Sequence, residues 1–115
     1  MITLISWGHK FGVPVANFKF DVSFLPNPWR EHKLRKASKM ELKTYMMEQD
    51  GFVQLVNSFS KLIETYYELY PEEDMRFAFC CSAGEYRSVI MVECVNDNLR
   101  EMKIQCKLEH PFSKI

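Results

Sequence analysis

Apolar and polar residues alternate most regularly between residues 18 and 25. The apolar positions are Phe18, Phe20, Val22 and Phe24, and the polar residues between them are Lys19, Asp21 and Ser23. A period of two is typical of a strand with one buried face. Two prolines follow at positions 26 and 28, and they end the strand because proline cannot continue a ladder of backbone hydrogen bonds.

Three other segments have the character of strands. Residues 2–6 and 75–81 are nearly continuous apolar runs, which are expected where a strand is covered on both faces. Residues 103–109 alternate again, with Ile104, Cys106 and Leu108 on the predicted inward face.

The longest predicted helix covers residues 52–70. Its apolar residues recur at intervals of three and four, which places them on one stripe: Phe52, Leu55, Val56, Phe59, Leu62, Ile63 and Tyr66. Pro71 ends it. Residues 87–100 form a second predicted helix, and residues 40–47 a shorter one.

The predicted order is therefore β-β-α-α-β-α-β. The last strand, helix and strand should form a parallel, right-handed unit. A chain of 115 residues accommodates one core, so we predict a single domain over residues 1–115. The predicted fold class is α/β, with a mixed, mostly parallel sheet of about four strands flanked by helices.

Charge adds little for the chain as a whole, because fifteen basic and fifteen acidic residues cancel. Locally the balance differs. Residues 30–43 are mainly basic and residues 64–74 are acidic, and a basic face can attract a polyanion on a neutral protein. We find neither a signal peptide nor a stretch long enough to span a bilayer, and expect a cytoplasmic protein.

The four cysteines do not suggest a disulfide framework or a zinc site. Cys80 and Cys81 are adjacent and would point to opposite faces of a strand, and no C-x-x-C motif occurs. The histidines at positions 9, 32 and 110 stand apart. We therefore expect reduced thiols, no metal and no cofactor.

Residues 81–88, CSAGEYRS, are the main candidate for chemistry, because they join a buried strand to the start of a helix. Small residues at positions 82–84 allow backbone amides to turn inward, and the first helical turn adds unpaired amides and the positive end of its dipole. Arg87 could grip phosphate oxygens, and Ser82 and Ser88 could donate hydroxyl hydrogen bonds. This pattern predicts an anion-binding loop, most readily for phosphate.

Two other interpretations of this segment stay open. One is an ordinary strand-to-helix turn with a surface arginine. The other is the signature of cysteine-dependent phosphatases, C-x-x-G-x-x-R-[ST], with Cys81 as the nucleophile, Arg87 holding the phosphoryl group and Asp21 as the candidate general acid. The histidine that usually precedes the nucleophile is replaced by Cys80. No Walker motif or G-x-G-x-x-G occurs, so nucleotide hydrolysis has no support.

Three blocks in order resemble a known family over nearly the whole chain. Residues 6–12 read SWGHKFG, where the family has S-F-G-[FH]-K-[YF]-G. Residues 20–28 read FDVSFLPNP against F-D-V-R-F-L-P-N-P, and residues 80–89 read CCSAGEYRSV against G-C-T-G-G-x-H-R-S-V. The chain thus resembles the C-terminal domain of the RNase adapter protein RapZ and its YvcJ-type relatives, here as a free-standing domain.

The resemblance implies a binding domain with a regulatory or adapter role and no catalytic residues. In that family the domain binds small regulatory RNA and glucosamine-6-phosphate, a sugar phosphate. The phosphate contacts carried over are Ser82, Ala83, Gly84, Glu85, Tyr86, Arg87 and Ser88. The second-tier ligand contacts are Lys10, Asp21 and Asn27.

Departures from the family pattern reduce its positive charge. Tyr86 replaces a histidine, Ser23 replaces an arginine, and residues 107–110 replace a more basic segment, which should weaken RNA binding. The remaining candidate RNA contacts are Lys33, Arg35 and Lys36, although such a run is equally often a solvated loop. The candidate partners are a phosphorylated small molecule, RNA, a second copy of this chain and a separate nucleotide-binding protein. No membrane partner is expected.

Overall fold

The structure is a computed structural model, and it describes residues 1–31 and 34–115. The elements follow the predicted order, with two short 3-10 helices added. They are β1 (Ile2–Gly8), η1 (His9–Phe11), β2 (Phe18–Asp21), η2 (Pro28–Arg30), α1 (Lys39–Met47), α2 (Phe52–Leu69), β3 (Met75–Cys81), α3 (Arg87–Glu101) and β4 (Cys106–Glu109).

The four strands form one sheet in the order β2-β3-β1-β4. All of its pairs are parallel: Ile2 of β1 aligns with Met75 of β3 on one side and with Cys106 of β4 on the other. The predicted α/β class with about four strands is confirmed, and the described sheet is parallel throughout, with no antiparallel pair. Parallel strands end at a common edge, so the loops after β1, β2 and β3 lie together.

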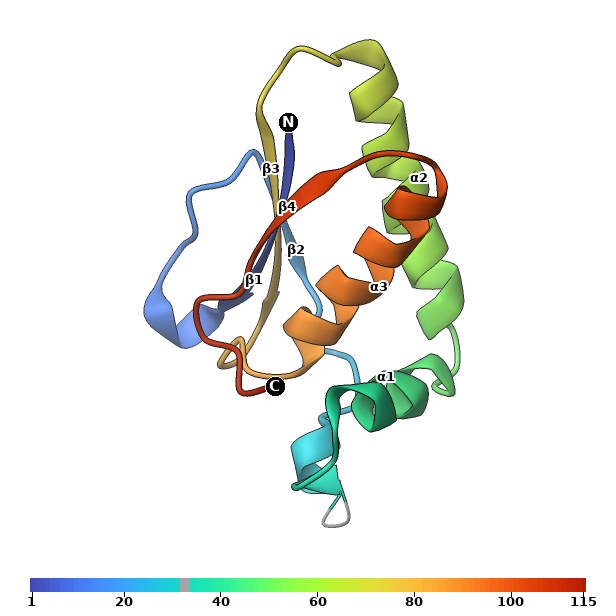
Figure 1. The fold of residues 1–115 in the computed structure, drawn as a ribbon. Helices are drawn as coiled ribbons and strands as arrows, with labels where there is room; N and C mark the ends of the chain where they lie inside the picture. Colours follow the sequence, from blue (N-terminus) through green and yellow to red (C-terminus); the bar gives the residue numbers. More distant parts are fainter. Residues whose placement is uncertain (32–33) are drawn as a thin grey trace.

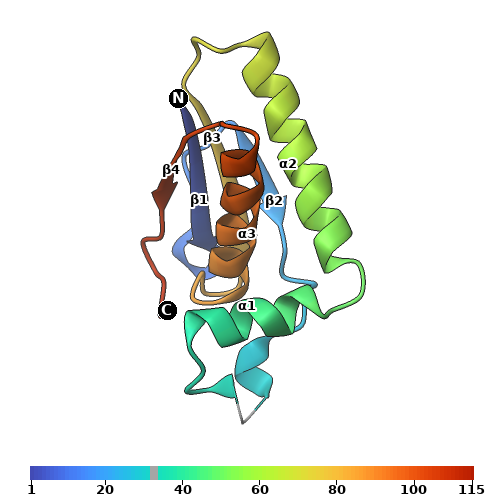
Figure 2. The ribbon, with the colours of Figure 1, turned by 45° about the vertical axis from the view of Figure 1, so that its right-hand side comes forward.

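The helices cover one face of the sheet (Figures 1 and 2). Alternate strand residues point toward them, including Leu4, Phe77 and Phe79, which are fully buried. The predicted apolar stripe of α2 packs against this face through Phe52 and Ile63. Helix α3 lies on the same face and has ten buried residues. Apolar burial on this side provides the main stabilisation of the domain.

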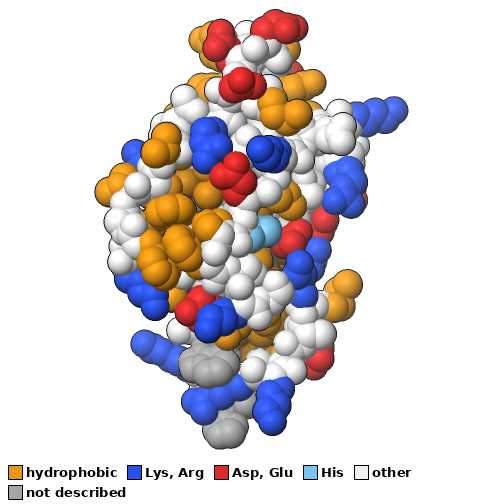
Figure 3. All heavy atoms as spheres, turned by 60° about the vertical axis from the view of Figure 1, so that its left-hand side comes forward, with side chains coloured by type: hydrophobic (Ala, Val, Ile, Leu, Met, Phe, Trp, Pro, Cys, Tyr) orange, Lys and Arg blue, Asp and Glu red, His pale blue; other side chains and the backbone are white. Residues whose placement is uncertain are grey.

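The opposite face of the sheet carries no helix. A small cluster of Ile5, Ala78 and Cys80 lies there, with Trp7 and Ala16 packed against it. The chain between η1 and β2 crosses this side, where Val13 and Val15 are exposed, and apolar side chains gather on this side in Figure 3. None of the helices in the described part of the chain is both long and apolar enough to cross a bilayer.

The strand predicted over residues 18–25 is shorter than the alternation suggested. β2 ends at Asp21, whose carboxylate Oδ1 accepts a hydrogen bond from the Ser23 amide at 2.9 Å. Leu25 N then donates to Val22 O, which closes a turn, and Phe24 is 69% exposed. The side chain of Asp21 therefore ends the strand four residues early, as aspartate does in turns.

The last strand also begins later than predicted, at Cys106 rather than at residue 103. Lys103 adopts a left-handed conformation with φ of 63°, and Ile104 N donates to Leu99 O. Residues 103 and 104 thus finish the helix end of α3 and do not pair in the sheet.

Candidate functional site

The loop between β3 and α3 lies at the carboxyl edge of the sheet (Figure 1). Open α/β sheets usually bind ligands at this edge. β3 is an inner strand with β1 and β2 on either side, so the loop that follows it is enclosed by the ends of both neighbours.

Two glycines allow the loop to press against the end of β1. A Cβ added to Gly8 would lie 2.4 Å from the Ala83 carbonyl carbon, and a Cβ added to Gly84 would lie 2.7 Å from Gly8 N. Gly84 also has a φ of +70°, which glycine adopts without strain. Lys10 N donates to Ser82 O at 3.2 Å, so the connection after β1 holds the loop as well.

Most backbone amides of the segment that joins β3 to α3 have no acceptor within the described part of the chain. Within residues 1–31 and 34–115, the amides of residues 82–85 and of the first turn of α3, residues 87–89, donate to no protein acceptor. The helix begins after Tyr86 without a side-chain cap. These free N–H groups and the positive end of the helix dipole together favour an anion at this point.

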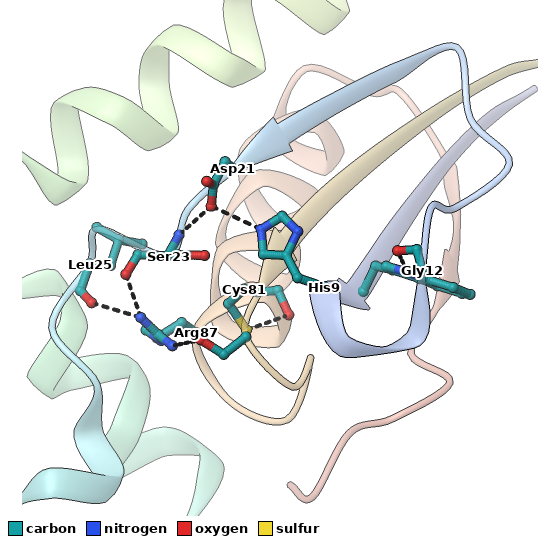
Figure 4. Close-up of polar contacts among 10 residues, drawn as sticks. His9, Gly12, Asp21, Ser23, Leu25, Cys81 and Arg87 are labelled. Carbon is teal, nitrogen blue, oxygen red and sulfur yellow. Dashed lines mark hydrogen bonds and ion pairs between the residues drawn. The ribbon is translucent and has the colours of Figure 1, made fainter.

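Arg87 is only 8% exposed and points into the loop region (Figure 4). Its Nη1 donates to the carbonyl oxygens of Ser23 and Leu25, the latter at 3.2 Å, and its Nη2 donates to Ser82 Oγ at 3.1 Å. The alternative interpretation, an ordinary turn with an arginine on the surface, is therefore wrong, because Arg87 is buried and hydrogen-bonded. The guanidinium joins the turn after β2 to the loop after β3, and places a positive charge beside the free amides.

A pocket of about 280 Å³ opens at the loop. It is lined by Asn27, Cys81, Ser82, Ala83, Glu85, Tyr86, Arg87 and Lys114. A second pocket, of about 380 Å³, adjoins it and shares Asn27, Ser82 and Arg87, with Arg30 added. Of the three predicted second-tier contacts, Asn27 lines both of these pockets, and the other two line neither.

Two basic residues that line these pockets, Lys114 and Arg30, were not predicted from the sequence to contact a ligand. Lys114 follows the last strand, and nothing in its local sequence marks it. Its amide donates to Glu85 O at 3.2 Å, which brings the chain end to the loop. Arg30 belongs to the basic segment already noted, and a contact with the loop could have been expected only from the fold.

Lys10 and Asp21 lie outside both pockets. Lys10 Nζ lies 5.2 Å from the centre of the Phe11 ring. Asp21 accepts a hydrogen bond from His9 at 3.1 Å. Hydrogen bonding from Ser23, with a smaller contribution from His9, lowers the pKa of Asp21 to about 2. This carboxylate holds a turn and stays ionised at neutral pH.

Cys81 and Asp21 point to opposite faces of the sheet. Cys81 packs into the helix-side core, and its Sγ donates to Ser88 Oγ at 3.3 Å. Asp21 aligns with Cys80, whose side chain belongs to the other face. The structure therefore does not bring together the nucleophile and the general acid that a phosphatase would need.

The predicted RNA contacts are only partly described. Arg35 and Lys36 are exposed, while Lys33 lies outside the described residues. Across the described ranges, no three His, Cys, Asp or Glu side chains gather as metal ligands would. The four cysteines are free thiols, and burial raises the pKa of Cys94 and of Cys106 to about 11.

The fold and the loop define the class: a small parallel α/β domain with helices on one face, whose strand–loop–helix unit presents free amides at the carboxyl edge. The chain belongs to the family described as the RapZ C-terminal domain, which matches residues 1–113. The resemblance seen in the three sequence blocks is therefore confirmed.

Curated relatives agree with this assignment. The chain is 35% identical to a "Nucleotide-binding protein" of Endomicrobium trichonymphae over 114 residues, which is 94% of this chain and 40% of the relative. It is 30% identical to one of Mycolicibacterium vanbaalenii, covering 95% and 36%, and 33% identical to one of Bifidobacterium adolescentis, covering 86% and 34%. The chain thus spans somewhat more than a third of the length of these relatives.

Proposed function

We propose that this domain is a non-catalytic binding module for a phosphorylated ligand, held by the loop of residues 81–88. The observation that carries the proposal is that amides without a protein acceptor, at residues 82–85 and 87–89, occur in the same segment as the buried guanidinium of Arg87, which is hydrogen-bonded to Ser82 Oγ. An anion with several oxygens satisfies such donors, and a phosphate group supplies those oxygens at tetrahedral positions.

The surroundings of the loop favour a small ligand with a polar body. The pocket of about 280 Å³ is close to the lower end of small-molecule sites, which begin at about 300 Å³. Lys114 adds a cation, and Asn27 and Glu85 add groups that can bind hydroxyls. Glucosamine-6-phosphate, the ligand implied by the resemblance, fits this description, with its phosphate on the amides and its ring toward Asn27.

The name "Nucleotide-binding protein" of the relatives is consistent with recognition of a phosphate. A nucleic-acid backbone is the second ligand of the proposal. Arg30 lines the adjoining pocket, and Arg35 and Lys36 are exposed on the same segment of chain. We further propose that ligand binding serves a regulatory or adapter role, as the family resemblance implies.

The test is a titration of ¹⁵N-labelled protein followed by NMR. Glucosamine-6-phosphate should shift the amides of residues 82–85, while glucosamine without the phosphate should not. Lys114→Gln should weaken the binding by about tenfold, the equivalent of one charge-assisted hydrogen bond. Lys107→Gln, an exposed lysine of β4 that lines neither pocket, is the matched control.

Three outcomes would count against the proposal or part of it. If neither phosphate nor glucosamine-6-phosphate shifts the loop amides, the anion site is refuted. If aryl phosphate is hydrolysed and Cys81→Ser abolishes the reaction, the domain is an enzyme. If labelled single-stranded RNA shows no salt-sensitive binding, or if Arg35→Gln with Lys36→Gln leaves that binding unchanged, the nucleic-acid part is wrong.

A further inference from the structure

The chain after β4 forms a strap along the carboxyl edge of the sheet. This C-terminal strap, residues 110–115, lies beside the loop that precedes α3 (Figures 1 and 2). The Phe112 ring stacks on the Phe11 ring with centroids 3.7 Å apart, and the Lys114 amide donates to Glu85 O. Because Lys114 lines the pocket at the loop, the strap forms one of its walls.

His110 fixes the start of the strap between three elements. Its Nδ1 lies 2.7 Å from Ser6 Oγ on β1. Its Nε2 lies 3.6 Å from Glu93 Oε1 on α3, and that carboxylate is paired with Lys39 of α1 at 3.0 Å. Nε2 is buried, and it has no hydrogen-bond partner in the described part of the chain.

This geometry suits a neutral imidazole. The Ser6 hydroxyl is completely buried, and among the described residues His110 is its one hydrogen-bond partner. In the neutral tautomer with its hydrogen on Nε2, facing Glu93, the ring accepts a hydrogen bond from the Ser6 hydroxyl at Nδ1. A protonated ring also carries a hydrogen on Nδ1, so the Ser6 hydroxyl would lose its acceptor inside the protein.

The charged groups that face the ring do not reverse this preference. Glu93 on α3 attracts a protonated ring, but Lys39 on α1 repels it and already neutralises the carboxylate. Glu109, the neighbour of His110, is paired with Arg76. Burial lowers the pKa of His110, with Glu93 opposing and Lys39 reinforcing the effect.

We propose that His110 is a proton-controlled latch, which holds the C-terminal strap when neutral and releases it when protonated. It is a positioning residue, since it reaches the pocket only through Lys114. The part of the proposal that concerns ligand affinity rests on the proposed function, whereas the latch itself does not.

The sign follows from the lowered pKa. Above pH 6.5, the ordinary pKa of histidine, the ring is neutral in both the held and the released strap, so protonation does not favour release. As the pH falls below that value, the released strap, with its solvated ring, takes up the proton first. The held state is therefore lost progressively between pH 6.5 and the lower pKa of the latched ring.

The first experiment uses the ligand-free protein. The Lys114 amide and the His110 ring Cε1–H are followed by NMR from pH 8 to pH 5, and both should change with one midpoint below pH 6.5. His110→Asn keeps an acceptor for Ser6 and cannot be protonated, so the change at Lys114 should vanish. His9→Asn removes an exposed histidine and should leave it intact.

The second experiment measures affinity for sulfate, whose charge is constant over this range. Affinity should fall by about tenfold between pH 7.5 and pH 5.5 in the native protein and in His9→Asn, and stay constant in His110→Asn. The latch is refuted if the NMR signal of the Lys114 amide does not change while His110 titrates. It is also refuted if that signal still changes with pH in His110→Asn. If the Lys114 amide signal follows the titration of His110 but sulfate affinity does not depend on pH, the positioning role of His110 is refuted. Absence of sulfate binding at every pH counts against the anion site, and the ligand-free experiment then decides the latch.

Discussion

The contact of Gly8 with the anion loop gives a sharp prediction for Gly8→Ala. Gly8 has φ of −113° and ψ of 127°, so alanine meets no backbone strain at this position. The added methyl group would lie 2.4 Å from the Ala83 carbonyl carbon and 2.5 Å from its oxygen. Both atoms belong to the backbone and cannot rotate away, so the loop must move by about 1 Å to reach an ordinary contact distance of about 3.4 Å.

The expected cost is about 2 kcal/mol, which is typical of a methyl group forced into a well-packed region. For a domain of this size, the melting temperature should fall by roughly 8 °C, on the basis of about 4 °C per kcal/mol. The same movement displaces the amides of residues 82–85. Loss of one or more of their hydrogen bonds should weaken phosphate binding by at least about tenfold.

Thermal melting and NMR titration with phosphate measure the two effects. Gly51→Ala is the matched control. Gly51 has φ of +80° with nothing within 4 Å of an added Cβ, so alanine there incurs backbone strain of about 1–2 kcal/mol far from the loop. Both variants should melt lower, and only Gly8→Ala should lose phosphate affinity. A Gly8→Ala protein with native stability and native affinity would refute the close contact.

Two further predictions concern the turn after β2. Arg87→Met leaves the carbonyls of Ser23 and Leu25 without their donor, and should lower the free energy of unfolding by about 3 kcal/mol in urea denaturation; an unchanged midpoint would contradict the bracing role. Asp21, with its pKa lowered to about 2, stabilises the fold above its ordinary pKa of 3.8 and loses that contribution as the pH falls from 3.8 toward 2. Its side chain is two-thirds exposed, so Asp21→Asn should remove less than about 1 kcal/mol of this acid-dependent stability, measured by thermal melts between pH 5 and pH 2. Asp50→Asn, which removes a carboxylate from another loop, is the control and should change stability with pH as the native protein does.

Periodicity predicted the elements because apolar burial imposes it. The stripe of α2 and the buried run of β3 lie within one residue of the predicted bounds, since their side chains face one continuous core. The alternation at residues 18–25 misled because Val22 is buried and Phe24 is exposed in a turn that Arg87 holds from a distant segment. Pattern alone cannot report a hydrogen bond between residues so far apart in the chain.

The features of the candidate site that depend on local sequence were predictable, and those that depend on contacts between distant segments were not. Small residues followed by a helix start predict free amides, and these depend only on local sequence. The opposed faces of Asp21 and Cys81 follow from strand register, which the sequence does not specify across a parallel sheet. Lys114 and the His110 latch depend on where the chain after β4 returns, and that becomes visible only in three dimensions.

The position of β1 at the centre of the sheet has a consequence for how the domain is made. Ile2 pairs with Met75 and with Cys106, so β1, which precedes the other three strands in the chain, gains its two neighbours only after β3 and β4 have been synthesised. Until then, one of the most apolar segments of the chain stays unpaired on the ribosome. Such long-range pairing slows folding. A chaperone that binds extended apolar segments should therefore be able to bind β1 before β4 pairs with it.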